Sequence, residues 1–338
     1  MYTQFTAEEA RAIDSKFTLP RFLCRPGGAI GWWFLAYPWP VDHWAVTAFW
    51  SLFTGYFLFC WTSCFHETVH QTLTSSKKVS IWLGRFLGMA MFVPYTAYRE
   101  THIRHHAYLN KPYDWELWPY ASPSCSLGFR RVFVILDLLC GVITSPIIYG
   151  RIYFHPASPL RNPAVRRTIR NEYLGMLAFW GLVLGLIQYY HVWGGFVKAW
   201  LIPVMIASVL QTGRKLTEHL GMASFDPLQG TRTVLGKNWL TRFTTFVNFD
   251  IFIHGPHHRH PRVAHNLLAQ KMNDYLEDNP GTDFPVYQHY WEATRAMLPF
   301  LFRNPGCGVN AGGQTPAQHD VDVQDFVADV NREVLARS

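Results

Sequence analysis

Charged residues are scarce in this chain of 338 residues. They make up 16% of the sequence, whereas soluble domains usually carry about 25%. Four stretches contain no charged residue at all: 26–41, 44–65, 173–197 and 199–213. A helix needs roughly 20 apolar residues to cross a bilayer, so the second and third stretches are long enough, and the shorter first and fourth would need flanking side chains that reach the interface. We therefore expect an integral membrane protein.

Paired cysteine motifs and a signal peptide are also missing. The six cysteines form no C-x-x-C pair, and Cys60 and Cys64 lie one helical turn apart in an apolar stretch, which is typical of buried free thiols. Residues 1–25 are polar and lack the compact apolar core of a cleavable signal peptide. The sequence thus predicts reduced cysteines and a cytoplasmic N-terminal arm over 1–25.

The order of apolar segments predicts an all-α membrane fold with four transmembrane helices in two hairpins. The first hairpin pairs 26–41 with 44–65, and the second pairs 173–197 with 199–213. Segments 79–98 and 132–150 each contain one charge, Arg85 and Asp137, and we expect them to be interfacial or re-entrant helices. If the histidine clusters described below converge on one site, they all lie on the same side of the membrane. The chain must then cross the membrane an even number of times between any two of them.

The domain boundaries follow from composition. The expected membrane domain covers 26–303, with a cytoplasmic helical cap that holds the histidines. Residues 304–316 are rich in Gly, Pro and Asn and predict a flexible linker, and 317–338 predict an amphipathic helix of unknown function.

The formal net charge of +7 is unevenly distributed. Basic residues gather before the first span and throughout 66–172. The short loop 38–43 contains no Lys or Arg, and the loop 191–198 contains only Lys198. This pattern places both termini and the large polar regions in the cytoplasm. Attraction to anionic lipids accounts for it, so we expect no nucleic-acid partner.

Nine of the 16 histidines fall in four places. Three are motifs, HETVH at 66–70, HIRHH at 102–106 and HGPHH at 254–258, and the fourth is a lone histidine in EHLG. Spacings of three and four residues place side chains on one helix face, where imidazoles can converge on a metal. In the third box Pro256 fits best in a first helical turn, with His254 just before the helix. The candidate metal ligands are His66, His70, His102, His105, His106, His219, His254, His257 and His258.

HETVH taken alone matches a zinc protease, with Glu67 as general base. That hypothesis needs one further ligand and gives no reason for the other two boxes. Eight or nine imidazoles are too many for one tetrahedral zinc and suit two metal ions, although imidazole ligands do not identify the metal. A non-catalytic metal-binding membrane protein is a third interpretation.

From about residue 60 to 270 the pattern resembles the membrane-bound fatty acid desaturase and alkane hydroxylase superfamily of histidine-box, non-haem di-iron enzymes. The second box is followed by Asn110, Pro112, Asp114 and Glu116, as in that superfamily, and the third by Pro261. The resemblance implies that the nine histidines bind two Fe ions, with O2 as co-substrate. One position departs from the pattern: several members have an Asn four residues before the lone histidine, where this chain has Lys215, and Asn248 is a possible substitute.

The implied activity is oxidation of C–H bonds in a fatty acyl or lipid chain, with fatty acid desaturation as the leading hypothesis. A hydroxylase and a terminal-alkene-forming fatty acid decarboxylase remain alternatives that the motifs do not separate. The loop RPGG at 25–28 resembles a haem loop without its histidine, so electrons are expected from a separate ferredoxin, rubredoxin or small cytochrome.

Metal-bound histidines usually donate their second N–H to a carboxylate or carbonyl. The candidates for this role next to the ligand positions are Glu67, Glu100, Asp114, Glu116, Glu218, Asn248 and Asp250. The other histidines are expected to be ordinary polar residues: His43, His155, His191, His260, His265, His289 and His319.

Overall fold

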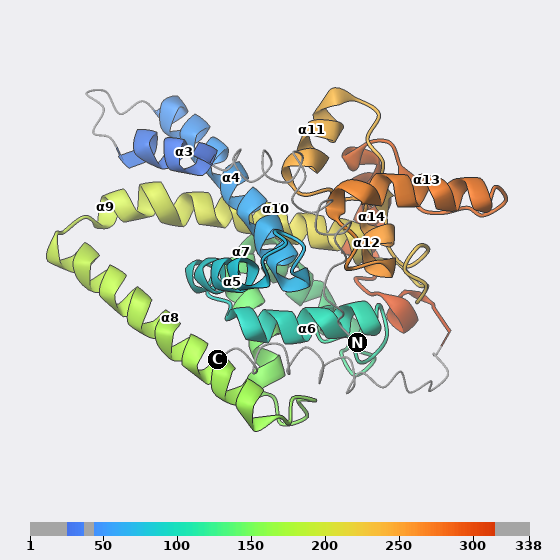
Figure 1. The fold of residues 1–338 in the computed structure, drawn as a ribbon, viewed down its shortest axis with the longest axis horizontal. Coiled ribbons are helices and arrows are strands. Elements are labelled where there is room, and N and C mark those ends of the chain that lie inside the picture. The colour runs from blue at the N-terminus through green and yellow to red at the C-terminus, as the bar shows by residue number, and fades with distance from the viewer. Residues whose placement is uncertain (1–25, 37–43, 315–338) are drawn as a thin grey trace.

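The computed structural model describes residues 26–36 and 44–314, which are mainly helical (Figure 1). The N-terminal arm, the C-terminal helix over 317–338, His43 and His319 lie outside the described residues. The helices in chain order are α3 (Pro26–Ala36), α4 (Trp44–His70), α5 (Lys77–Ala90), α6 (Tyr95–Ala107), α7 (Leu127–Phe154), α8 (Pro163–Tyr189), α9 (Trp193–Phe196), the π-helix η1 (Val197–Leu201), α10 (Ile202–His219), α11 (Trp239–Val247), α12 (His254–Arg259), the short η2 (His265–Leu267), α13 (Leu268–Asp278), α14 (Tyr290–Arg303) and the short η3 (Gly308–Ala311).

The described chain departs from an all-α fold in one place. Strands β1 (Thr233–Val234) and β2 (Val286–Tyr287) pair in parallel, with Thr233 opposite Val286. This two-residue ladder joins the segments on either side of α11, α12 and α13, so it fixes the region that contains the third histidine box.

Four of the described helices are long and apolar enough to cross a membrane. They are α4, α7, α8 and the continuous stretch Trp193–His219. The set includes α7, which covers the expected interfacial segment 132–150. Helix α3 has 11 residues, about 16 Å of rise, and the remainder of the expected span 26–41 lies outside the described residues.

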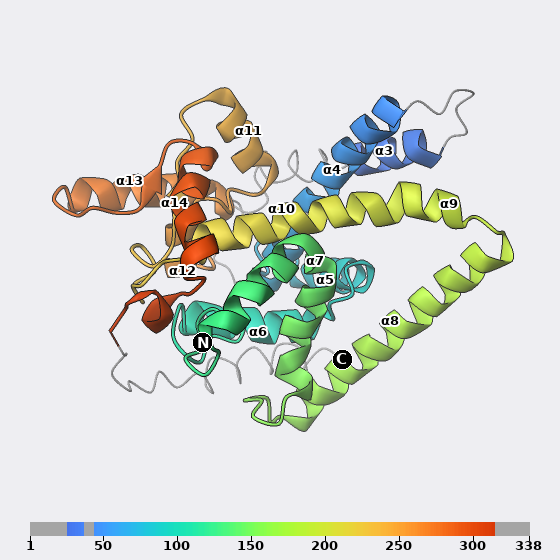
Figure 2. The ribbon, with the colours of Figure 1, turned by 180° about the vertical axis from the view of Figure 1, so that it is seen from behind.

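The charge within α7 is satisfied inside the protein. The buried Asp137 carboxylate accepts hydrogen bonds from Tyr120 Oη at 2.9 Å and Thr144 Oγ1 at 2.6 Å, and it lies 2.7 Å from Lys215 Nζ. The helix also departs from helical backbone angles at Cys140 (φ −128°, ψ 37°) and changes direction visibly (Figure 2). Helix α7 is therefore a bent helix with a paired internal charge.

Helices α4 and α10 pack closely and each ends at a histidine. At Gly55 a Cβ atom would lie 2.6 Å from Ile206 Cγ2, so only glycine allows this approach. Leu58, Phe59 and Ala207 form a buried cluster at the same contact. This packing places the end of α4 beside the end of α10.

The expected flexible linker over 304–316 is wrong for residues 304–314, which pack against the body. The Cys307 side chain is fully buried and its Sγ donates to the carbonyl of His219 at 3.2 Å, while Gly308 N donates to Met222 O at 2.8 Å. Gly308 has φ +56°, and a Cβ there would lie 1.9 Å from Asn110 O. The Gly-rich composition serves a tight contact here rather than mobility.

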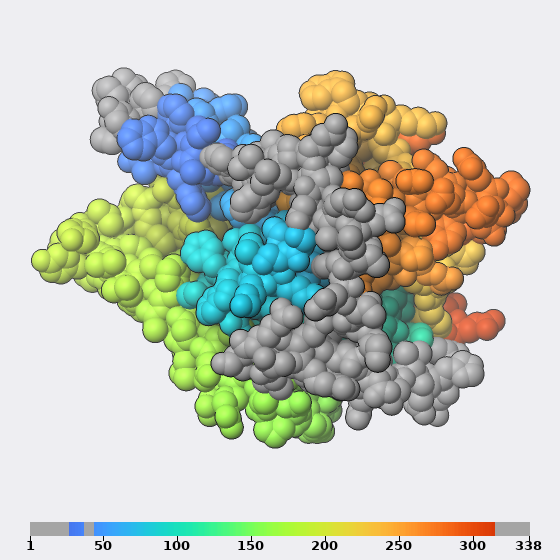
Figure 3. All heavy atoms as spheres, viewed as in Figure 1, coloured from blue at the N-terminus to red at the C-terminus, as the bar shows by residue number. Residues whose placement is uncertain are grey.

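Large apolar side chains remain exposed on the long helices. On α8 they include Leu174, Leu177 and Leu182, and this helix forms one edge of the molecule (Figure 3). An exposed apolar surface of this kind is expected of helices that face lipid. The chain is thus a membrane protein with four candidate spans.

Candidate metal centre

The nine candidate histidines come from four helices. The last turn of α4 supplies His66 and His70, α6 supplies three, α10 ends at His219, and α12 supplies three. All are buried except His106, which is half-buried. The third box differs slightly from expectation, because α12 begins at His254 itself rather than after it.

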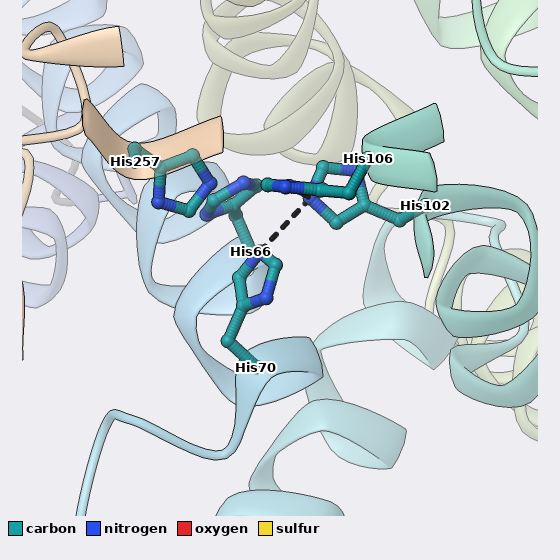
Figure 4. A group of neighbouring side chains, drawn as sticks. All are labelled: His66, His70, His102, His106 and His257. Atoms are coloured by element: carbon teal, nitrogen blue, oxygen red, sulfur yellow. Dashed lines mark hydrogen bonds between the residues drawn. The ribbon is translucent and has the colours of Figure 1, made fainter. Parts of the chain in front are cut away.

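These histidines form two groups that could each hold a metal ion. The five-histidine group contains His66, His70, His102, His106 and His257, and the four-histidine group contains His105, His219, His254 and His258. Within each group the ligand nitrogens all lie within 4.8 Å of one another, close to the roughly 4.2 Å that separates opposite nitrogens bound at about 2.1 Å from one ion. Figure 4 shows the five-histidine side chains turned toward one another.

Two of the boxes are divided between the groups. In the second box, His102 and His106 belong to the five-histidine group and His105 to the four-histidine group. In the third box, His254 and His258 belong to the four-histidine group and His257 to the five-histidine group. Adjacent helical residues lie about 100° apart around the helix axis, so the neighbours His105 and His106, and likewise His257 and His258, turn to different groups. Each of these boxes therefore contributes to both groups and ties them together.

The imidazole nitrogens in both groups are arranged as metal ligands would be. His70 Nε2 lies 3.0 Å from His102 Nε2 (Figure 4), and His219 Nε2 lies 2.8 Å from His254 Nε2. The buried Nε2 atoms of His66 and His257 have no hydrogen-bond partner within the described chain. Converging, unsatisfied imidazole nitrogens are costly unless they bind something, and imidazole is a common ligand for transition metals.

The environment keeps most of these imidazoles neutral. Burial, followed by the charges that neighbouring imidazoles would carry, lowers the pKa of His254, His257 and His258 well below the ordinary histidine value. Metal ligation requires the neutral ring. For His105 burial acts in the same sense, but the carboxylates of Asp114, Glu116 and Glu218 together outweigh it and raise the pKa.

Two carboxylates accept hydrogen bonds from ligand candidates of the second box. His102 Nδ1 donates to Glu116 at 2.7 Å, and His105 Nδ1 donates to Asp114 at 2.8 Å. Burial alone would raise the pKa of Glu116, but His102, His105 and hydrogen bonds lower it to about 2. These contacts leave each Nε2 free to face its group, which is the usual arrangement around metal-bound histidine.

Two further acidic candidates also contact box histidines. Glu67 lies 3.2 Å from His66 Nδ1 and accepts a 2.6 Å hydrogen bond from Thr72 Oγ1. Glu218 is paired with Arg214 at 2.9 Å and lies 3.5 Å from His254 Nε2. Each of these two carboxylates therefore contacts a box histidine and is also held by a second neighbour, Thr72 for Glu67 and Arg214 for Glu218.

The other three candidates for orienting a ligand have partners outside the histidine groups. Glu100 pairs with Arg104 at 2.8 Å, Asn248 accepts from Ser63 Oγ at 2.8 Å, and Asp250 lies 3.9 Å from His265. They are close to the ligand histidines in sequence, but these contacts turn their side chains toward other helix faces.

The remaining described histidines lie outside both groups: His155, His191, His260, His265 and His289. The Nε2 of His260 is 2.6 Å from Tyr275 Oη. It therefore behaves as a hydrogen-bonded polar residue, as expected.

An apolar cavity of about 840 Å³ is lined by residues that adjoin the five-histidine group. Its wall includes Phe65, which precedes His66 in the chain, and Tyr98, whose ring centroid is 5.4 Å from that of His102. Tyr149 also lines the cavity, and its Oη donates to Glu116 at 3.0 Å. A largely apolar pocket with a few polar groups at one end is typical of a ligand site.

Comparison with known proteins identifies the family. The fatty acid desaturase family model matches residues 42–291. The chain belongs to the fatty acid desaturase family. It is 24% identical over 297 residues to the sn-1 acyl-lipid omega-3 desaturase (ferredoxin) of Synechocystis sp., covering 82% of this chain and 78% of the relative.

Two plant desaturases are similarly distant. The chloroplastic omega-3 fatty acid desaturase of Glycine max is 25% identical over 291 residues, covering 78% of this chain and 58% of the relative. The Delta(12)-acyl-lipid-desaturase of Punica granatum is 23% identical over 316 residues, covering 82% and 78%. The chain therefore spans less than two thirds of the soybean relative.

Sequence reasoning missed two residues that contact carboxylates beside the histidine groups. Tyr149 donates to Glu116 and Arg214 pairs with Glu218, yet neither residue lies in a histidine motif. A charged residue close to a histidine in an apolar span was the available signal for Arg214, and Tyr149 had none. Lys215, which the sequence marks as a departure from the expected Asn, is paired with Asp137 and also lines the cavity.

Proposed function

We propose that this protein is an oxygen-dependent, non-haem di-iron oxidoreductase that acts on C–H bonds of a fatty acyl chain, with fatty acid desaturation as its leading activity. The observation that supports this most directly is the pairing of two histidine groups with an adjacent apolar cavity of about 840 Å³. Hydroxylation and terminal-alkene formation by decarboxylation remain the alternatives within the same chemistry.

The nine box histidines would hold the two iron ions, and Asp114 and Glu116 would orient His105 and His102. Iron bound there would supply the oxidising chemistry by which dioxygen attacks an unactivated C–H bond. Phe65 and Tyr98 stack with ring centroids 4.6 Å apart at the cavity wall. They would keep water away and align the chain beside the five-histidine group.

The zinc protease hypothesis receives less support. Glu67, its general base, is held by Thr72 and His66, and both HETVH histidines belong to a group with three others. A hydrolytic site needs an open position for substrate and water beside the base, and we assign Glu67 the orientation of His66 instead.

We infer that hairpins built on α3–α4 and on α8–α10 cross the membrane and that α7 lies at the interface. His105 and His219 share a group, so an even number of crossings separates them. Three candidate spans lie between these residues, so one does not cross. The bend at Cys140 favours α7 for that role, and the positive-inside pattern favours a cytoplasmic centre and cytoplasmic termini.

The electron donor in this proposal is a separate protein, such as a ferredoxin, a rubredoxin or a small cytochrome. The name of the Synechocystis relative includes ferredoxin. A chain with net charge +7 would attract an acidic carrier.

Expression in a host that supplies lipid, oxygen and reductant tests the proposal. The purified protein should contain about two irons per chain, and mass spectrometry of total lipids and volatiles should detect new double bonds. The variant His105→Ala is the inactive control. Hydroxylated chains or terminal alkenes would select an alternative, whereas one zinc per chain without any oxygen-dependent product would contradict the proposal.

A further inference from the structure

Five arginines are buried in the described part of the chain, and four of them have clear acceptors. Arg104 and Arg214 pair with Glu100 and Glu218, and the other two, Arg130 and Arg232, donate to backbone carbonyl groups. Arg99 differs. Its side chain is 2% exposed, and its Nε and Nη1 atoms have no hydrogen-bond partner within the described residues.

Arg99 lies on the face of α6 that meets the end of α4. One turn before it, Tyr95 Oη donates to Thr68 O at 3.0 Å, and one turn after it, His102 Nε2 lies 3.0 Å from His70 Nε2. Residues 95, 99, 102 and 106 follow helical spacing along this face. The guanidinium is therefore placed beside the five-histidine group.

A second buried donor occupies the same junction. Gln71 directly follows His70, is 2% exposed, and its Nε2 has no acceptor within the described chain. Its backbone has φ +61°, an unusual conformation for a residue other than Gly that often accompanies a functional site. The unsatisfied groups of Arg99 and Gln71 are all donors, so their common requirement is an acceptor.

The nearby carboxylates are engaged elsewhere. Among the described residues, Glu67, Glu100 and Glu116 already have partners in Thr72, Arg104 and His102, respectively. A buried cation whose donors lack acceptors is strongly unfavourable, and metal ions in the adjacent group would add further positive charge. An anion from outside the chain resolves both problems.

We propose that Arg99, assisted by Gln71, binds the carboxylate of a free fatty acid substrate beside the five-histidine group. The planar guanidinium fork matches a carboxylate in two parallel hydrogen bonds. Tyr98, the residue before Arg99 on α6, lines the apolar cavity, so the space that would receive the alkyl chain begins one residue along the helix from the guanidinium. This inference rests on the proposed function and narrows its substrate from acyl chains in general to free acids.

The test compares a fatty acid with its own methyl ester on the iron-loaded protein in detergent. Binding affinities are measured for dodecanoic acid and methyl dodecanoate with wild type, Arg99→Met and Arg99→Lys. Arg131→Met is the matched control, because Arg131 is an exposed arginine that donates to Arg303 O, away from both histidine groups. Iron content is measured for every variant.

We expect wild type and Arg131→Met to bind the acid about tenfold or more tightly than the ester, as a charge-assisted hydrogen bond predicts. Arg99→Met should bind both alike and keep its iron, and Arg99→Lys should retain part of the preference. If Arg99→Met does not fold, the ratio of acid to ester binding in wild type and in Arg99→Lys still tests the inference. Equal binding of acid and ester by wild type would overturn the inference.

Competition and product analysis complete the test. Sodium acetate and inorganic phosphate should not compete with dodecanoic acid at comparable concentration, and effective competition would show a site for free anions and contradict the assignment. Oxidation of esters without acid preference would leave the proposed function standing and remove only this inference. Absence of any oxygen-dependent product from any acyl compound would instead remove the proposed function.

Discussion

Glu116 connects His102 to Tyr149: its carboxylate accepts from His102 Nδ1 at 2.7 Å and from Tyr149 Oη at 3.0 Å. The same tyrosine lines the apolar cavity. One buried carboxylate thus links a ligand candidate of the five-histidine group to the wall of the apolar cavity.

Replacing Glu116 by Gln should weaken metal binding roughly 10- to 100-fold, the range observed when groups that orient metal-bound histidines are removed. The variant Tyr149→Phe removes only one hydrogen bond to the same carboxylate and should keep its iron. Iron content after dialysis against a chelator measures both effects. Equal iron retention by wild type and Glu116→Gln would show that this contact does not support ligation.

Glu67→Gln separates the oxygenase from the protease. The amide can still accept from Thr72, so we expect iron content near that of wild type and acyl-chain oxidation reduced by less than about tenfold. A protease would lose its general base and virtually all activity. Product formation per iron is the measurement, and complete loss with full iron content would favour catalytic chemistry at Glu67.

Single histidine variants should empty one group at a time. His70→Ala removes a member of the five-histidine group and His258→Ala a member of the four-histidine group. We expect each to reduce iron from about two to about one per chain, because each group could hold an ion of its own. Elemental analysis of the purified variants measures this. Loss of both ions from either variant would show that the groups bind metal only together.

Cavity volume should control chain length. Val142→Trp places an indole in the cavity wall, and its neighbour Ile143, which is 60% exposed, provides the matched control Ile143→Trp. The first variant should shift product toward shorter chains at unchanged iron content, because the filled volume is no longer available to the substrate. Competition between acyl chains of different length measures the shift. An unchanged preference for acyl-chain length would show that the acyl chain does not bind in this cavity.

Stability should fall in mild acid. Burial holds the pKa of His254, His257 and His258 well below its ordinary value, whereas the unfolded chain titrates near 6.5. As the pH falls below about 6.5, the unfolded state takes up protons that the folded state does not, so the free energy of unfolding decreases. Thermal unfolding of the metal-free protein as a function of pH measures the slope. His258→Gln should make the slope shallower, and a flat profile in wild type would contradict neutral burial.

The three histidine motifs were sufficient to predict eight of the nine members of the two groups, because spacing along a helix is encoded locally, whereas the lone His219 was predicted from its place after the last apolar stretch and from the family resemblance. Their division into five and four was not predictable. It depends on how α4, α6, α10 and α12 approach one another, as shown by His105 and His106, which are adjacent in sequence but belong to different groups. Membrane spans were predictable only in outline: composition separates apolar from polar segments, whereas the bend at Cys140 and the pairing of Asp137 with Lys215 are tertiary.

Composition alone gives the wrong prediction at residues 304–314. Gly and Pro are frequent both in flexible linkers and in tight packed turns, and only the contacts of Cys307 and Gly308 distinguish the two. Arg99 is a second residue whose role the sequence does not reveal. Nothing in the sequence separates it from the paired arginines, because the lack of an acceptor among the described residues is a property of its surroundings.

The division of the third box between both groups has a consequence for biosynthesis. His257 completes the five-histidine group and His258 the four-histidine group, so neither group is complete until these adjacent residues have left the ribosome. Helices α4 and α6 carry five of the nine histidines. These histidines are therefore synthesised before α7 to α10, and their groups remain incomplete until α12 follows. In the proposed di-iron protein, both metal positions can therefore be filled only after the four candidate spans have been synthesised.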